Sequence, residues 1–380
     1  MSLHELLVSQ KLIVCVGPGG VGKTTASAAI GLAAARAGRK TLVLTIDPAR
    51  RLADALALDG LDDASQRVPT ETLGEGAIAG ELHAAMVDTG RSFDSLIERV
   101  TPDPTARKRI LDNRVYQAVS RSLSRSHAYV AMERLYHAMN SGEYDLVVLD
   151  TPPARNAIDI LDAPSQLASF LDGRVVNWFL PDQGDKPKGL GARLVARGGK
   201  VATQLLGRIT GSELLDGIID FLVAFAELRE GFGERAASVD ATLRADDTAF
   251  VLVSSAHPSA ADDAGWLRDD LERRNVQVDA TVFNQSYIAL RPGEPRTVVN
   301  GLSQAADADL DALGAAELQG LATSMRALRV EAARDNQRYQ EIVDGLSAEL
   351  PTACTVVRVP RLNEEVRDLP SLLQLAEFLL

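Results

Sequence analysis

The sequence predicts an α/β fold: a doubly wound, mostly parallel sheet with a helical insertion subdomain. Short apolar runs of strand length alternate along the chain with longer helical stretches. The first two runs, residues 12–16 and 41–46, enclose a helix of small residues over 23–37, which ends before Gly38. A strand, a helix and a strand in so short a span imply a right-handed βαβ unit and therefore parallel strands.

The rest of the chain continues this alternation. Further strands are expected at residues 81–87, 146–149, 250–254, 278–283 and 355–359, and longer helices at 115–139 and 318–346. The stretch between the strands expected at 146–149 and 250–254 is long enough for a subdomain of its own. We therefore expect a sheet domain at residues 1–164 and 245–380, and a helical insertion subdomain at residues 165–244.

Composition and charge narrow the class of protein. The 380 residues are 46% hydrophobic and 24% charged, which is typical of a globular chain. The net charge of −12 argues against a nucleic-acid partner, because nucleic-acid binding needs a basic surface. No apolar run has the length of a transmembrane helix and the N-terminus lacks the basic start of a secretion signal, so we expect a cytoplasmic protein.

Cys15 and Cys354 form no CxxC pair, so no zinc is expected.

A phosphate-binding loop follows the first predicted strand. Residues 17–24 are GPGGVGKT and fit the pattern G-x-x-x-x-G-K-[ST] between a strand and a helix. Glycine lets backbone N–H groups close around phosphates, Lys23 would neutralise the β- and γ-phosphates during catalysis, and Thr24 would offer a hydroxyl to Mg²⁺. The residues expected to hold the nucleotide here are Gly17, Gly19, Gly20, Val21, Gly22, Lys23, Thr24 and Thr25.

Two carboxylates follow predicted strands and so belong at the same edge of a parallel sheet. Asp150 comes directly after the run 146–149 and is expected to join Thr24 in holding Mg²⁺. Asp47 follows the run 41–46 and has two interpretations. It could cap a helix that has Pro48 at its first position, or it could orient the water that attacks the γ-phosphate. Both interpretations can hold together.

Five segments carry a family resemblance. They are GGVGKTT (19–25), TIDPARRLADAL (45–56), VVLDTPPARNAIDIL (147–161), FNQ (283–285) and VPRLNEEVRDLPSL (359–372). In order and spacing they resemble the P-loop, switch I, switch II and adenine-binding segments of the arsenite-pump and Get-pathway targeting ATPases, within the deviant-Walker P-loop group. The resemblance implies ATP as the nucleotide, Asp47 as the catalytic group that activates water, and adenine contacts from Asn284, Pro360, Arg361 and Leu362.

The sequence departs from this family at three places. Pro18 stands where the family has a lysine that reaches across a dimer to the partner's phosphates, which leaves Arg50 and Arg155 as other sources of charge. The family's interfacial zinc-binding CxxC and the cysteine triad of the arsenite pumps are both missing, so arsenite is not expected as a substrate. The resemblance implies a dimer, which would be a homodimer or a heterodimer with a related ATPase that keeps the lysine.

The insertion subdomain is the expected place for a client or partner. Residues 173–209 hold seven basic and two acidic residues in an acidic chain, and apolar residues recur there at helical spacing. Such a helix could lie on a membrane, making the protein peripheral to it, or could grip an apolar client helix. A surface helix with its charges in water is the alternative. The stretch 214–228 is also apolar at helical spacing and could be core, subunit contact or client groove.

These observations together predict an ATPase that binds and hydrolyses Mg-ATP. We expect a nucleotide-driven dimer cycle that handles a protein or membrane client. The alternative is an ATP-binding scaffold or regulatory subunit with weak turnover, paired with a lysine-bearing paralogue. A P-loop ligase or kinase acting on a metabolite, and an ATPase that positions chromosomes or division sites, are further alternatives.

Overall fold

The computed structural model describes residues 2–47, 49–74, 76–87, 103–113, 117, 127–172, 233–286, 315–351, 354–362 and 366–379. Within them, eight strands form one sheet in the order β3-β4-β2-β5-β1-β6-β7-β8. The strands are β1 (Leu12–Val16), β2 (Lys40–Thr45), β3 (Gln66–Arg67), β4 (Glu81–Met86), β5 (Leu146–Asp150), β6 (Thr248–Ser254), β7 (Ala280–Ser286) and β8 (Thr355–Pro360).

All neighbouring strands pair in parallel except β3 and β4, which are antiparallel. The predicted mostly parallel sheet is therefore confirmed, and all seven predicted strands are present. The additional strand β3 is a short edge strand. Every residue of β1 is buried, and its side chains alternate between the two hydrophobic cores on the two faces of the sheet. A strand buried on both faces is apolar throughout, which explains the uninterrupted apolar run.

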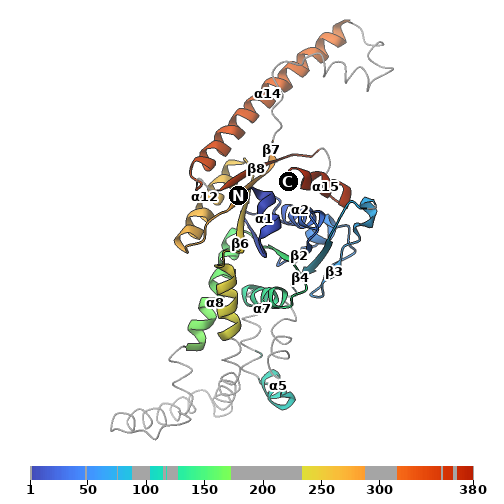
Figure 1. Cartoon of the computed structure of the whole chain (residues 1–380). Coiled ribbons are helices and arrows are strands. Elements are labelled where there is room, and N and C mark those ends of the chain that lie inside the picture. The colour runs from blue at the N-terminus through green and yellow to red at the C-terminus, as the bar shows by residue number, and fades with distance from the viewer. Residues whose placement is uncertain are drawn as a thin grey trace.

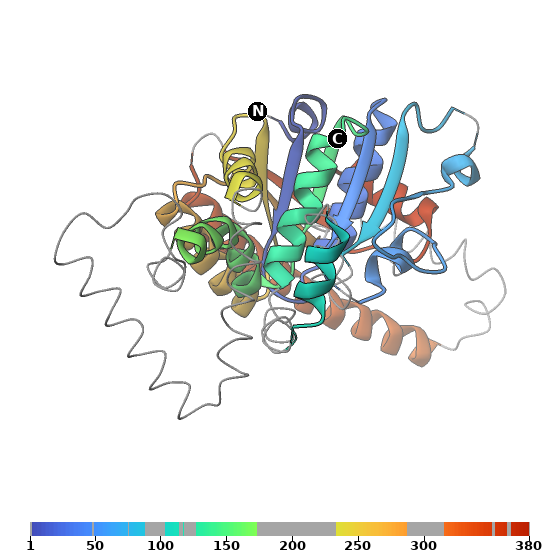
Figure 2. The ribbon, with the colours of Figure 1, turned by 90° about the horizontal axis from the view of Figure 1, so that it is seen from below.

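Helices cover both faces of the sheet (Figures 1 and 2). One face packs against α1 (Leu3–Ser9), α2 (Lys23–Arg36) and α15 (Leu369–Glu377), with α3 (Arg51–Ala55) and the 3-10 helix η1 (Thr70–Leu73) beside them. The other face packs against α7 (His127–Asn140), α8 (Ala154–Asp172), a helix over 233–243, α12 (Pro258–Arg273) and the C-terminal part of α14 (Ala315–Ala348). A further helix, α5, spans Pro104–Leu111.

Helix α2 lies very close to the sheet because its residues are small. A Cβ atom on Gly31 would lie 2.4 Å from a methyl group of Val43 on β2. The alanines of α2 are buried as well. This close packing fixes the direction of α2 relative to β1 and so fixes the phosphate-binding loop that joins them.

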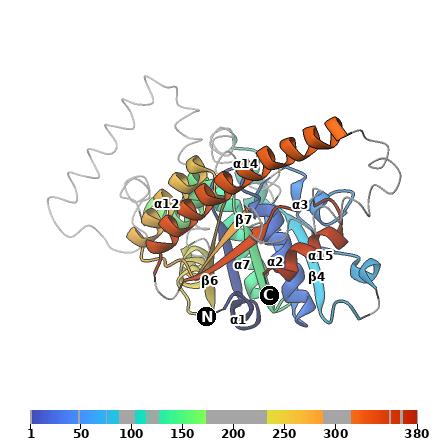
Figure 3. The same cartoon turned by 90° about the horizontal axis from the view of Figure 1, so that it is seen from above.

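Helix α14 is the longest described element, and it extends beyond the sheet in Figures 1 and 3. It contains the whole of the helix predicted at 318–346. Its C-terminal part packs against α12, where Arg268 pairs with Glu349 just past the end of α14. Of the helix predicted at 115–139, the structure describes residue 117 and α7, and residues 115–116 and 118–126 lie outside the described part.

The insertion subdomain predicted at 165–244 is described only at its two ends. Helix α8 runs through the expected boundary after residue 164 without a break, and Ala236, Val239 and Leu243 of the helix 233–243 lie in the core. Residues 173–232 lie outside the described residues, and with them the basic segment 173–209 and the apolar stretch 214–228. The subdomain therefore stays a prediction. In the part of the chain that is described, no helix is both long and apolar enough to cross a membrane.

Candidate functional site

The phosphate-binding loop connects β1 to α2 at the carboxyl edge of the sheet. Its first glycine, Gly17, passes so close to β6 that a Cβ atom there would lie 2.0 Å from the carbonyl oxygen of Val253. Its last glycine, Gly22, has a φ of +87°, and a Cβ atom there would lie 2.3 Å from Nδ2 of Asn284. Both positions require glycine, so the loop is held tightly against the ends of β6 and β7.

Lys23 is the first residue of α2, and its ammonium group lies inside the loop. Its Nζ donates a 2.6 Å hydrogen bond to the carbonyl oxygen of Pro18, and both residues are buried. Burial lowers the pKa of Lys23, while the carboxylates of Asp150 and Asp47 act in the opposite direction. The ammonium group is thus enclosed by the loop, where phosphate oxygens could replace the carbonyl oxygen as its partner.

Asp150 ends β5 and is completely buried between the ends of β1 and β2. Its Oδ2 accepts a 2.8 Å hydrogen bond from Thr45, and its Oδ1 accepts a 3.4 Å hydrogen bond from Ser27. Burial raises the pKa of Asp150, and hydrogen bonds from Thr45 and Thr24 oppose this effect. A carboxylate beside a threonine hydroxyl is a set of oxygen donors that suits Mg²⁺. Thr24 and Asp150 therefore fit the metal that the sequence predicts.

Asp47 follows β2 at the same edge of the sheet. Its Oδ1 accepts the N–H of Ala49 at 3.0 Å, and its Oδ2 pairs with Nη1 of Arg51 at 3.2 Å. The expectation that Asp47 caps a helix is wrong, because α3 begins at Arg51 and has Arg50 at its N-cap. Asp47 instead closes a short turn ahead of the helix. Its charge acts on Lys23, and its proposed role in orienting water stays a prediction.

The structure describes the side chain of one of the two arginines that the sequence analysis named as sources of charge, Arg50. The guanidinium of Arg50 donates to the carbonyl oxygen of Asp59, which turns it away from the loop. The side chain of Arg155 lies outside the described part of the structure. Arg51, which sequence reasoning missed, is the arginine that contacts Asp47. The spacing of four residues between an acidic and a basic residue was the available signal for this pair.

The segment after β5 is tied to the phosphate-binding loop by hydrogen bonds. The hydroxyl of Thr151 donates to the carbonyl oxygen of Cys15 at 2.7 Å. The N–H of Ala154, at the start of α8, donates to the carbonyl oxygen of Gly17 at 3.1 Å. A change in the position of the loop would therefore be passed directly to the start of α8.

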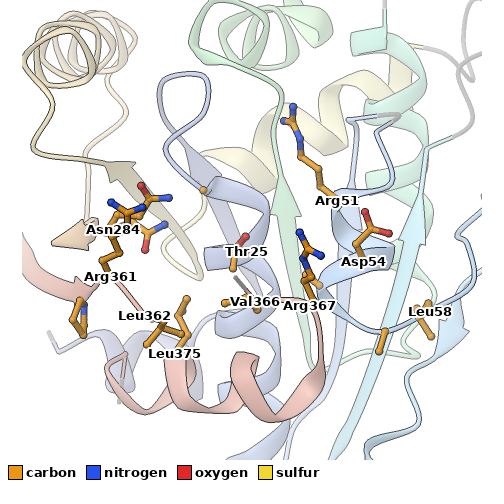
Figure 4. Close-up of a pocket in the computed structure, with 15 residues that line it drawn as sticks. Thr25, Arg51, Asp54, Leu58, Asn284, Arg361, Leu362, Val366, Arg367 and Leu375 are labelled. Atoms are coloured by element: carbon orange, nitrogen blue, oxygen red, sulfur yellow. The ribbon is translucent and has the colours of Figure 1, made fainter. Parts of the chain in front are cut away.

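A cavity of about 890 Å³ lies beside the loop (Figure 4). Asn284 on β7 forms part of its wall, and Nδ2 of Asn284 donates a 2.9 Å hydrogen bond to the carbonyl oxygen of Val21. The N–H of Arg361 bonds to the carbonyl oxygen of Ser286, which holds the segment after β8 beside β7. The lining residues are Gly22, Thr25, Arg51, Asp54, Ala55, Ala57, Leu58, Asn284, Gln285, Pro360, Arg361, Leu362, Val366, Arg367 and Leu375.

This cavity brings together residues that the sequence predicts as nucleotide contacts from three distant segments. Gly22 and Thr25 come from the loop and α2, Asn284 from β7, and residues 360–362 from the end of β8 and the segment after it. The other predicted loop residues, from Gly17 to Thr24, lie next to it in the chain. Its volume is within the range of small-molecule sites. Arg51, Asp54 and Arg367 also line it, and sequence reasoning named none of them.

Comparisons with known proteins agree with this geometry. Residues 10–179 match the model of the anion-transporting ATPase family. A protein of Aquifex aeolicus that carries the name of an arsenical pump-driving ATPase is 31% identical over 163 residues, which cover 41% of this chain and 50% of that protein. ATPase GET3 of Malassezia globosa is 27% identical over 163 residues, covering 43% of this chain and 45% of that protein. The chain thus spans about half the length of these two relatives.

One relative matches along the full length. The ATPase ASNA1 homolog of Leishmania braziliensis is 24% identical over 433 aligned positions, which cover 100% of this chain and 95% of that protein. The matched family segment, residues 10–179, contains β1, the phosphate-binding loop, Asp47 and Asp150. The family match therefore contains the phosphate side of the candidate site.

Proposed function

We propose that the chain binds Mg-ATP at the loop and cavity described above and hydrolyses it, and the match of residues 10–179 to the anion-transporting ATPase family supports this proposal. The observation that carries this proposal is the continuity of the site. A buried lysine and a buried hydroxyl–carboxylate pair lie at one end, and a cavity of nucleotide size lies at the other. The three parts suit the γ-phosphate, the metal and the nucleoside of one ligand.

In this proposal each residue has a distinct task. The N–H groups of the loop and the ammonium of Lys23 bind the phosphates, and Lys23 gives up the carbonyl oxygen of Pro18 to do so. Thr24 and Asp150 hold Mg²⁺, which neutralises phosphate charge when bound. Asp47 accepts a hydrogen bond from the water that attacks the γ-phosphorus, and the bond to the bridging oxygen of ADP breaks.

The adenine end of the ligand would lie against β7 and β8. Nδ2 of Asn284 is engaged by the carbonyl oxygen of Val21, so its Oδ1 is the atom that could accept a hydrogen bond from an exocyclic amine. Pro360 and Leu362 offer apolar surface to the base from the wall formed by the segment at the end of β8. An amine-bearing base such as adenine suits this arrangement.

We further propose that ATP drives a dimer cycle in the cytoplasm, and that this cycle acts on a protein or membrane client and not on arsenite. The names of the relatives support an ATPase, and the missing pump cysteines argue against arsenite. The dimer could be formed by two copies of this chain or with a related subunit. Pro18 favours the second form, because it is buried and supplies a carbonyl oxygen but no charge to a partner's phosphates.

The test is steady-state ATP hydrolysis by the purified chain, beside Asp47→Asn and the control Asp59→Asn, with binding of Mg-ATP measured in parallel by calorimetry. Asp59 is an exposed carboxylate of the same segment. Turnover in the wild type and the control, with a loss of about 100-fold or more in Asp47→Asn at retained binding, supports a self-sufficient ATPase. Equal turnover in Asp47→Asn and the wild type would remove the catalytic role of Asp47.

The same experiment separates the alternative function. Tight binding without turnover in the wild type would favour an ATP-binding scaffold or regulatory subunit. In that case, turnover should appear on mixing the chain with a related ATPase subunit that has lysine at the position of Pro18. Absence of any Mg-ATP binding would contradict both forms of the proposal.

A further inference from the structure

We propose that Arg51 is a phosphate-binding residue of this site, which exchanges the carboxylate of Asp47 for the γ-phosphate when ATP binds. The inference rests on the proposed function, because it adds a residue to the same nucleotide site. Arg51 would supply, from the same chain, a positive charge that the phosphate-binding loop lacks at Pro18.

The resting partner of Arg51 is held weakly. Nη1 of Arg51 lies 3.2 Å from Oδ2 of Asp47, and the Arg51 side chain is 66% exposed while that of Asp47 is 21% exposed. Water competes strongly with an ion pair of this exposure. A γ-phosphate carries more negative charge than a carboxylate and accepts paired hydrogen bonds from a guanidinium, so it would be the stronger partner.

Arg51 is also in the right place. It lines the same cavity as Gly22 and Thr25 of the phosphate-binding segment, and Figure 4 shows Thr25 between Arg51 and Asn284. Its charge and that of Lys23 repel each other across the site. An anion that binds near both groups would be attracted by both, which relieves this repulsion.

The neighbouring arginine does not share this position. Arg50 donates to the carbonyl oxygen of Asp59 and so is engaged away from Asp47. Within the described part of the segment 45–56, Arg51 is the basic side chain in contact with the Asp47 carboxylate.

The exchange would couple two events. When Arg51 moves to the phosphate, Oδ2 of Asp47 loses its partner and can accept a hydrogen bond from water, while Oδ1 keeps the N–H of Ala49. ADP has no γ-phosphate, so Arg51 would return to Asp47 after hydrolysis. Arg51 would therefore distinguish ATP from ADP.

The experiment measures the affinities of the full chain for Mg-AMP-PNP and for Mg-ADP by calorimetry. The variants are Arg51→Ala, Arg51→Lys and the control Arg67→Ala. Arg67, on the edge strand β3, is an arginine of similar exposure that forms an ion pair with Glu71 at the same spacing of four residues. Thermal melting without nucleotide checks that each variant is folded. If Arg51→Ala melts at a lower temperature than the control, the affinities of Arg51→Lys are used for the test instead.

The expected result is a selective loss. Arg51→Ala should weaken Mg-AMP-PNP about tenfold or more and Mg-ADP less than about twofold, since a hydrogen bond to a charged group is lost only with the triphosphate. Arg51→Lys should recover part of the affinity, because it keeps the charge but not the paired donors. Arg67→Ala should bind both nucleotides as the wild type does.

A double-mutant cycle with Asp47→Asn tests the exchange itself. Asp47→Asn should tighten Mg-AMP-PNP in the wild-type background, because Arg51 no longer has to leave a carboxylate, and this gain should shrink in the Arg51→Ala background. Equal weakening of AMP-PNP and ADP by Arg51→Ala, or no weakening, would overturn the inference and leave the proposed function standing. Failure of the wild type to bind either nucleotide would overturn both.

Discussion

Gly22→Ala is expected to destabilise the protein through Asn284 rather than through helix α2. Gly22 has a φ of +87°, and a Cβ atom there would lie 2.3 Å from Nδ2 of Asn284. The same nitrogen donates a 2.9 Å hydrogen bond to the buried carbonyl oxygen of Val21. The added methyl group must displace the amide, and the carbonyl oxygen then loses its donor.

The magnitude follows from two contributions. An alanine in the left-handed region costs about 1–2 kcal/mol. A buried acceptor without its donor costs about 1–3 kcal/mol. Gly22→Ala should therefore cost about 2–5 kcal/mol of unfolding free energy, and Asn284→Ala about 1–3 kcal/mol. The double variant loses the hydrogen bond only once, so the two costs should fall short of additivity by about 1–3 kcal/mol.

The assay is urea unfolding of the wild type, the two single variants and the double variant. Gly38→Ala is the matched control, because Gly38 has a φ of +94° and no atom lies within 4 Å of the place that an added methyl group would take. It should cost about 1–2 kcal/mol and should add to Asn284→Ala within about 0.5 kcal/mol. Additivity of Gly22→Ala with Asn284→Ala would refute the contact and with it the attachment of β7 to the loop.

Three further predictions concern two buried groups of the site. Burial raises the pKa of the Cys15 thiol from 9.0 to about 12. Iodoacetamide at pH 8 should therefore label Cys15 only after unfolding, as measured by mass spectrometry. Fast labelling of the native chain would contradict this burial. Because the folded state keeps this proton while the unfolded thiol releases it near pH 9, its contribution to stability is lost as the pH rises from about 9 to 12, and Cys15→Ala should flatten that loss in urea titrations. The ratio of ATP affinity with Mg²⁺ to ATP affinity in EDTA should be about tenfold or more smaller in Asp150→Asn than in the wild type, while the affinity in EDTA changes little. An unchanged ratio would show that Asp150 does not hold the metal.

Local patterns predicted most of the elements. The strand expected at 12–16 is β1 without change, and the helix expected at 23–37 is α2, Lys23–Arg36. Each of these elements has one dominant pattern: an apolar run buried on both faces for β1, and small residues bounded by glycines for α2. Strand β3 was missed because two polar residues, Gln66 and Arg67, show no such pattern. The expected cap at Asp47 was wrong because its carboxylate accepts the N–H of Ala49 in a turn that precedes the helix, and the helix begins only at Arg51.

The amino-acid sequence by itself determined the fold class, the phosphate-binding loop and the identity of the carboxylates that follow β2 and β5, because each depends on residues that are close together in the chain. Only the tertiary structure decided the order of the strands, the hydrogen bond from Asn284 to Val21, and which of two adjacent arginines contacts Asp47. The strand order and the bond from Asn284 to Val21 join segments that are far apart in the sequence. The choice between the two arginines depends on where each side chain points, because spacings of three and four residues both permit a contact with Asp47. Packing sets these arrangements.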